Sequence, residues 1–262
     1  MKKLSLLITL LLSLNLFAQD SIATDSTEKK FYVSFFGGNT GLTDFIWETY
    51  YPFVTNYSEG KATSWKFSAG VDVSLKMKKN YFFNMSWSLN IINSEHVEDL
   101  SKNSNFISGT PYSVNNYSVK HSAYVLKPGF SKNLFETEKF TVNAGFNIPF
   151  IFYQQYTMNI IRNGYDASKT LVSSYEDIYT VESAQSVGLE FSSGINYLAC
   201  NSFYLCGKVG IGLNYTWSDS NLISTSKDLM TGIGTSPLII YKSFQHFGTS
   251  DVFANLGFGF RF

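Results

Sequence analysis

The stretch WKFSAGVDVSLKM, residues 65–77, decides the fold, because it alternates without a break. Every odd position from Trp65 to Met77 is apolar, and every even position between them is small or polar. A helix would spread these apolar residues around its circumference, whereas a strand places alternate residues on opposite faces. The stretch therefore predicts a β-strand with one apolar and one polar face.

The same alternation recurs in further stretches of the chain. They are 31–36, 81–91, 117–125, 140–152, 187–197, 203–217 and 252–262, and the runs at 31–36 and 117–125 are the weakest. The sequence thus predicts an all-β protein with eight strands. A further hairpin in the third or fourth long connection would raise the number to ten.

The connections between these runs alternate between short and long along the chain. Short segments lie near 78–80, 133–138 and 199–202. The other connections span about 20 to 30 residues each, longer than compact domains usually contain. Short turns at one end and long loops at the other are typical of a transmembrane up-and-down antiparallel β-barrel, with periplasmic turns and extracellular loops.

A soluble β-sandwich also has alternating strands, so two further observations matter. The runs are longer than the usual soluble strand and match the roughly 9–11 residues that cross a bilayer at a tilt. The polar face is rich in Gly, Ser and Asn, which suit a narrow barrel interior better than a water-exposed sheet. The membrane barrel is therefore the favoured interpretation.

Composition agrees with that choice and excludes several classes. The 262 residues include 24 Phe and 17 Tyr, only 15% are charged, and the net charge is zero. Such a chain is too aromatic for a disordered segment and has no basic excess for nucleic acid. Two cysteines cannot form a disulfide scaffold, and we expect both to be free thiols.

The amino terminus predicts export. Lys2 and Lys3 precede an apolar stretch that ends near Ala18, as in a cleaved secretory signal. We expect a signal peptide over 1–18, a flexible periplasmic lead-in over 19–30 and the barrel domain over 31–262.

Aromatic residues on the apolar faces sort by height along the strands. Two aromatic girdles around an aliphatic band are typical of a barrel that spans a bilayer. We expect one girdle at the short-turn end, made of Tyr81, Phe140, Tyr197, Phe203 and Phe262, and one at the other end, made of Trp65, Tyr117, Phe152, Tyr215 and Trp217.

The signal peptide, the amphipathic strands and the ending LGFGFRF, residues 256–262, resemble small Gram-negative outer-membrane β-barrels of the OmpA/OmpX type. The chain is also similar to outer-membrane β-barrel domain proteins of Bacteroidetes, including PorT-like ones. The resemblance implies that Phe258, Phe260 and Phe262 form the carboxy-terminal signal for the barrel-assembly machinery. It implies a location in the cell outer membrane, among lipid and lipopolysaccharide, and leaves the function open.

Charged residues on the polar faces are expected inside the barrel. They are Lys66, Asp72, Lys76, Lys120, Glu190, Lys208 and Arg261. A short turn at Cys200 predicts that Glu190 lies diagonal to Lys208, and we expect that contact, or a contact of either with another lumen charge. Such a network is either structural filling of a closed lumen or a gate on an ion path, and we favour filling.

His121 is expected on the outward face, at the level of the lipid headgroups. Some small barrels are lipid-modifying enzymes, but the position two residues later is Ala123, so the serine of the deacylase pattern is missing. His96 and His246 are expected in long loops. We therefore predict no catalytic, cofactor-binding or metal-binding residue.

The long loops hold the remaining candidates for function. The first contains Phe45, Trp47, Tyr50, Tyr51, Phe53 and Tyr57, and the last contains the apolar run 238–247. Exposed aromatic residues at this density indicate either a binding or adhesion surface or packing of loop on loop. We expect a monomeric structural, adhesion or ligand-binding barrel, with transport or a secretion-accessory role as the alternative.

Overall fold

The computed structural model describes residues 30–42, 61–77, 80–99, 112–250 and 252–262. The expected signal peptide and the aromatic cluster of residues 45–57 lie outside these ranges. Within them, no helix is long and apolar enough to span a membrane. Their regular structure is one antiparallel sheet of twelve strands: β1 (Phe31–Gly38), β2 (Lys61–Lys76), β3 (Tyr81–Asp99), β4 (Tyr112–Glu136), β5 (Phe140–Asn147), β6 (Phe150–Tyr153), β7 (Tyr156–Tyr165), β8 (Leu171–Val181), β9 (Ala184–Leu198), β10 (Phe203–Asp228), β11 (Leu238–Thr249) and β12 (Phe253–Arg261).

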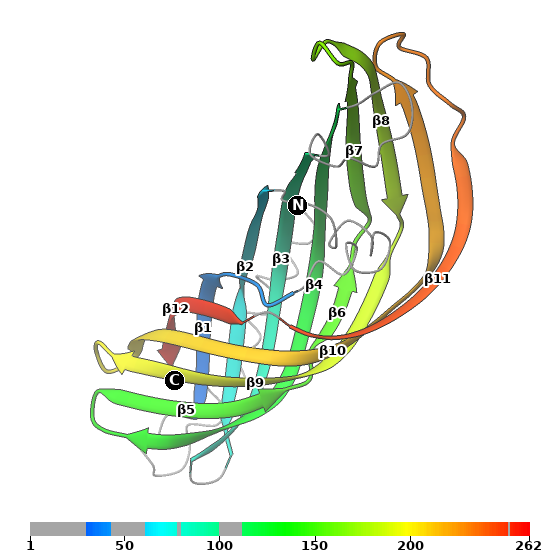
Figure 1. The fold of residues 1–262 in the computed structure, drawn as a ribbon. Coiled ribbons are helices and arrows are strands. Elements are labelled where there is room, and N and C mark those ends of the chain that lie inside the picture. Colours follow the sequence, from blue (N-terminus) through cyan, green and yellow to red (C-terminus); the bar gives the residue numbers. More distant parts are fainter. Residues whose placement is uncertain (1–29, 43–60, 78–79, 100–111, 251) are drawn as a thin grey trace, which may run out of the picture.

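The sheet closes on itself. Its pairings run β1–β2–β3–β4–β5–β9–β10–β12, and β12 pairs in turn with β1. The first and last strands of the chain meet in register from Tyr32 opposite Arg261 to Gly38 opposite Asn255. Closure leaves these strands without a free edge in the ring. Figure 1 shows the ring at the lower end of the molecule, around the carboxy terminus.

The predicted count of eight strands is not reproduced. One predicted run, 140–152, is divided into β5 and β6 at Ile148 and Pro149. Proline has no N–H for the ladder, so the strand is interrupted there. The Ile148 N–H turns to the carbonyl of Pro128, 2.8 Å away, on the neighbouring strand.

Segments expected as long loops contain the remaining additional strands. The hairpin β7–β8 is inserted between β4 and β10, and β11 pairs with the distal part of β10. These strands and the long strands β4 and β10, of 25 and 26 residues, form a curved sheet that rises from the ring. We call this part the distal extension, and the opposite end of the ring, with the turns before β3, β5 and β10, the short-turn end.

The outward face of the ring is mainly apolar. Outward neighbours at one level include Phe35, Phe258 and Leu205 on β1, β12 and β10. The same side of the ring exposes Val209 and Leu256, the latter at 77%. The alternation in β2, β3, β5, β9, β10 and β12 therefore predicted the outward faces correctly.

Candidate functional site

An ion pair crosses the middle of the barrel. Nζ of Lys127 on β4 lies 2.6 Å from Oε2 of Glu190 on β9, and both side chains are largely buried. The amide of Asn147 donates to the other carboxylate oxygen, Oε1, at 2.9 Å. The Lys127 ammonium also lies 4.9 Å from the ring centre of Phe253 on β12. Each charge is thus satisfied on more than one side, which a buried pair requires.

The predicted Glu190–Lys208 contact is not formed, and Glu190 makes the alternative contact that was expected beside it, with another charge in the lumen. Lys208 lies opposite Gly194 and Glu190 lies opposite Gly212, so the two side chains are separated along the strands. The real partner, Lys127, follows the end of the predicted run 117–125 and was not considered. Extending that run would have placed Lys127 on the face of Val125, which the sequence predicted to point outward, so alternation alone could not identify Lys127 as an interior charge.

An apolar cluster fills the barrel on the distal side of this ion pair. Its most deeply buried members include Val119 and Ile160, which have no exposed surface. Leu42, just after β1, turns inward and belongs to the same cluster. The full cluster is Leu42, Ile92, Tyr117, Val119, Ala123, Val125, Ile151, Tyr153, Met158, Ile160, Val181 and Ala184, with Tyr179 packed against it.

The apolar cluster corrects the predicted direction of the fourth strand. In β4 the odd residues point inward, whereas Tyr124, Leu126 and Phe130 are exposed outward. Tyr117 is therefore interior and not part of a girdle. Alternation identified the two faces, but both faces of this strand carry apolar residues, so it could not tell inside from outside.

This correction changes the assigned positions of two candidate site residues. Lys120, expected in the lumen, is exposed on the outside. His121, expected at the lipid surface, is buried inside with 5% exposure. Its ring centre lies 5.8 Å from that of Tyr153.

The absence of a side chain at Gly210 leaves room for Phe253, the aromatic ring next to the Lys127 ammonium. A Cβ at Gly210 would lie 2.5 Å from the ring of Phe253. Phe253 is 3% exposed and lies under the Lys127 ammonium. Glycine at 210 is thus needed for the ring to occupy the lumen.

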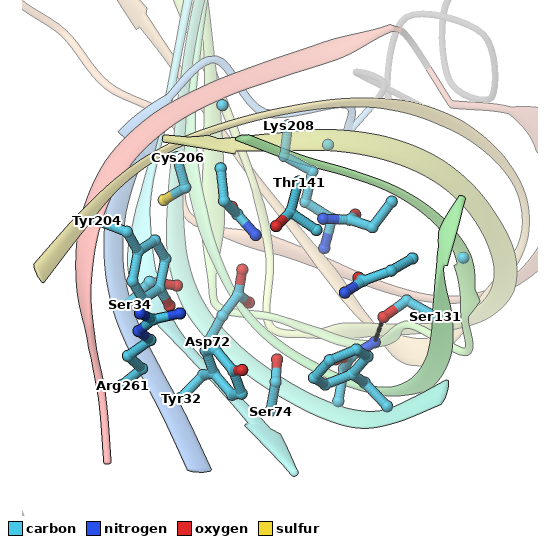
Figure 2. Close-up of a pocket in the computed structure, with 18 of the residues that line it drawn as sticks. Tyr32, Ser34, Asp72, Ser74, Ser131, Thr141, Tyr204, Cys206, Lys208 and Arg261 are labelled. Atoms are coloured by element: carbon cyan, nitrogen blue, oxygen red, sulfur yellow. Dashed lines mark hydrogen bonds between the residues drawn. The ribbon is translucent and has the colours of Figure 1, made fainter. Parts of the chain in front are cut away.

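A polar cavity of about 150 Å³ occupies the barrel between the ion pair and the short-turn end. Figure 2 shows Tyr32, Asp72, Tyr204 and Lys208 around it. It is lined mainly by hydroxyl, amide and charged side chains, with aromatic rings on one side.

The predicted lumen charges divide among several levels. Asp72, Lys208 and Arg261 line the polar cavity together. Lys66 lies further toward the distal extension, opposite Ile92 on β3. Lys76 lies at the short-turn end, and Glu190 belongs to the ion pair described above. The structure thus brings three of the seven into one site.

The girdle residues other than Tyr117 lie on the outward faces. Those on or beside the short-turn end are Tyr81, Phe140, Tyr197, Phe203 and Phe262, and those further along are Trp65, Phe152, Tyr215 and Trp217. Their rings contact one another, for example Phe140 with Tyr197 at 4.9 Å between ring centres. The three terminal phenylalanines 258, 260 and 262 are exposed on the same outward face.

The other candidate residues hold no reactive arrangement within the described ranges. His96 lies in β3 and His246 in β11, not in loops. Cys200 and Cys206 are free thiols, as expected, the first exposed and the second half-buried. The described residues contain no cluster of His, Cys, Asp and Glu that suits a metal ion.

Two aspartates organise the tips of the distal extension. Oδ1 of Asp166 accepts from the Ser168 hydroxyl at 2.6 Å and from the Thr170 amide at 2.9 Å, and these bonds hold the pKa of Asp166 below its usual value. Oδ1 of Asp228 accepts the Met230 amide at 2.8 Å, which lowers its pKa in the same way. Both are side-chain-to-backbone turn motifs.

Exposed apolar residues surround these tips. They are Leu171, Val172 and Tyr175 from β8, Leu229, Met230 and Ile233 from the turn after β10, and Leu238 and Ile239 from β11. The turn after β10 is fixed on β8, because the Leu229 amide donates to the carbonyl of Ser174 at 2.8 Å. The distal extension thus presents apolar side chains on an ordered frame.

No protein-family model matches the sequence, and no curated protein sequence matches it. Among solved structures, the outer membrane protein OprG from Pseudomonas aeruginosa is similar over 90% of this chain and 97% of that chain. The two share 10% sequence identity, with a TM-score of 0.32. Because both values are low, the chain's own residues carry the proposals that follow.

Proposed function

We propose that the protein is an integral outer-membrane β-barrel with a closed lumen, whose distal extension acts as a structural, adhesion or ligand-binding surface outside the cell. The ion pair and the apolar cluster that lie across the barrel interior are the observation that carries this proposal. They interrupt any continuous polar path through the barrel. The distal extension is then the part whose exposed surface is available to a partner.

The apolar outside of the ring supports membrane insertion. Side chains such as Val209, Ile211 and Leu256 are about half exposed or more. A contiguous apolar surface of this extent around a whole barrel needs an apolar solvent. A closed ring also satisfies the backbone groups of its strands, which hydrocarbon cannot.

Two layers close the lumen. The Lys127–Glu190 pair spans β4 and β9, and the apolar cluster lies directly beyond it. Water and ions would have to break the pair and then cross a packed apolar region, and both steps are unfavourable.

The length of the distal strands supports a surface role. β10 has 26 residues, while roughly 9–11 residues of a tilted strand cross the hydrocarbon region. More than half of β10 would therefore lie beyond the membrane. The apolar residues at the tips would face the medium there, where they suit a partner with an apolar surface.

The partners follow from this arrangement. Outer-membrane lipid and lipopolysaccharide would surround a monomeric ring, and an extracellular ligand or a secretion partner would meet the distal extension. The exposed terminal phenylalanines 258, 260 and 262 would serve the barrel-assembly machinery before insertion. A cleaved signal over 1–18 would deliver the chain.

Epitope insertion tests the orientation. One tag replaces the turn 167–169 in the distal extension, and a matched tag is inserted at Asn201 in the short turn. On intact cells we expect an antibody to label the first and to label the second only after the outer membrane is permeabilised. Labelling of the tag at Asn201 on intact cells would contradict the proposal.

A transport or secretion-accessory role remains the second candidate, and the polar cavity at the short-turn end favours it. Measurement of conductance separates the two. A lipid-modifying activity has less support, because His121 is buried inside the barrel and Ala123 follows it on the same face. We therefore propose a protein without enzymatic activity.

A further inference from the structure

We propose that the polar cavity at the short-turn end is a binding site for a neutral polyol of monosaccharide size. This inference is independent of the distal extension. It concerns the opposite end of the barrel and holds whether or not the distal extension binds a partner.

The first argument is the size and position of the cavity. Its volume of about 150 Å³ is comparable to cavities that admit one six-membered ring. Its distal side ends at Asn147, which donates to the ion-paired Glu190. Its other side reaches Thr137 and Lys139 in the turn before β5, so a solute can approach from the short-turn end.

The second argument is an aromatic wall. Tyr32 lies edge-on to Phe82 at 5.5 Å and to Tyr204 at 6.3 Å between ring centres. Phe82 and Tyr204 are each 7% exposed, so the wall is fixed by packing. Tyr204 fits because its neighbour is Gly259, where a Cβ would lie 2.5 Å from the ring. A rigid aromatic surface inside a polar pocket suits the apolar C–H face of a sugar ring.

The third argument is the supply of hydrogen-bonding groups. Amide side chains line the cavity from several strands: Asn84, Asn133, Asn143, Asn147, Asn196 and Asn255. Amides both donate and accept, as the hydroxyls of a polyol require. Hydroxyl groups of Ser74, Ser131 and Thr141 add to them (Figure 2).

The fourth argument is a buried acceptor. Oδ1 of Asp72 is shielded from solvent and accepts no hydrogen bond from the described residues. Asp72 points into the cavity, opposite Ser34 on β1 (Figure 2). A buried charged oxygen without a donor is unfavourable, so the site calls for a donor-bearing occupant. A ligand hydroxyl meets that need.

The charges that line the cavity favour a neutral ligand over an ion. Three carboxylates face three cations: Asp72, Glu136 and Glu138 against Lys139, Lys208 and Arg261. A cationic or anionic solute would gain no net attraction from this balance. Hydrogen-bond donors and hydrogen-bond acceptors both remain available to a polyol.

Cys206 provides a reporter inside the same cavity. The test uses the full mature barrel, folded in detergent, with Cys200→Ser, so that Cys206 is the thiol that reacts with a charged methanethiosulfonate reagent. The probes are D-glucose, D-galactose, D-mannose and N-acetyl-D-glucosamine. We expect at least one of them to slow the modification of Cys206 several-fold and in a saturable way.

The matched control is the complementary variant, Cys206→Ser, in which Cys200 at the exposed turn is the thiol that reacts. Its rate should not change with any sugar, which excludes an effect of viscosity or reagent. Asp72→Asn should weaken the binding of the protecting sugar by about tenfold, because the substitution removes a charged acceptor. Asn196→Ala should weaken it as well, and Asp228→Asn, at the distal tip, should not.

Several results would overturn the proposal. One is that Cys206 is unreactive in the folded protein although it reacts after unfolding. Others are that no sugar protects it, that ethanolamine or acetate protects while sugars do not, or that Asp72→Asn and Asn196→Ala both keep full protection. If Asp72→Asn does not fold, judged by heat-modifiable migration, Asn196→Ala decides the outcome.

Discussion

The two halves of the barrel interior differ in kind, although the outward faces around them are alike. Between the ion pair and the short turns, amide and hydroxyl groups surround an open cavity. Beyond the ion pair, aliphatic and aromatic side chains form the apolar cluster, in which no member is more than 6% exposed. The composition of the outward face is determined by the solvent around the barrel, so it is similar around both halves. The inward face is free of that constraint, so its composition can differ between the two halves.

The ion pair lies at the boundary between these halves. Lys127 and Glu190 meet where the polar lining ends and the apolar cluster begins. A buried pair is maintained there by hydrogen bonds on the polar side and by Phe253 and Leu42 nearby. The comparison of the two halves therefore predicts where substitutions act strongly and where they act weakly.

The largest effect is expected at the boundary itself. Lys127→Met leaves the Glu190 carboxylate buried without its cation, and loss of one partner of a buried pair costs about 3–5 kcal/mol. We expect this loss in the free energy of unfolding, measured by urea titration of the protein refolded in lipid vesicles.

A second substitution checks the cause of that loss. Glu190→Gln keeps an acceptor for Asn147 and removes the charge, so the double variant should be more stable than Lys127→Met alone. If the double variant is as unstable as the sum of the single ones, the pair does not couple and the account of the boundary is wrong.

The next effect concerns the apolar half. Ile160→Ala removes a fully buried side chain, and substitutions of this kind cost about 2–5 kcal/mol. Ile211→Ala is the matched control on the outward face, where the side chain is 48% exposed and where lipid would fill the space in the proposed membrane setting. Equal losses in urea titration would show that the distal interior is not a packed core.

A smaller effect is expected in the polar half. Ser131→Ala removes the acceptor of the Asn84 amide, 2.9 Å away, at the edge of the cavity. Water in the cavity can replace that partner, so we expect a loss of about 0.5–1.5 kcal/mol. A loss as large as that of Ile160→Ala would remove the distinction between the two halves.

The smallest effect lies at the tip of the distal extension and depends on pH. The hydroxyl of Ser168 and the amide of Thr170 lower the pKa of Asp166, so the turn is stabilised most above the unfolded value of about 3.9. That contribution is lost as the pH falls through the lower, folded pKa. NMR titration of the Ser168 and Thr170 amides should show the transition, and Asp166→Asn should abolish it.

Alternation predicted most of the ring from the sequence. The runs that begin at Trp65, Tyr81 and Phe203 each lie within one strand, whereas the run that begins at Phe140 is divided into β5 and β6. All four have the predicted outward faces, because strands with one apolar face carry the same alternating signal. The extra hairpin β7–β8 lies in the third long connection, where a further hairpin was considered. Its alternation is weaker, as expected if these strands lie beyond the proposed membrane, where no apolar solvent contacts one face.

The interior could not be predicted in the same way. At Val119 and Tyr124 both faces of β4 are apolar, so alternation could not choose the inward one. The Lys127–Glu190 pair joins strands that are not neighbours in the sequence, and its geometry depends on the register of the ring. Leu42 enters the lumen from a segment without periodicity, and no local pattern marks it.

The central claim is that the ion pair and the apolar cluster close the lumen. Current through planar lipid bilayers that contain the purified, refolded protein tests it most directly. The account predicts no steady channel for the native chain, at either polarity. A stable, reproducible open conductance from the native chain would contradict it.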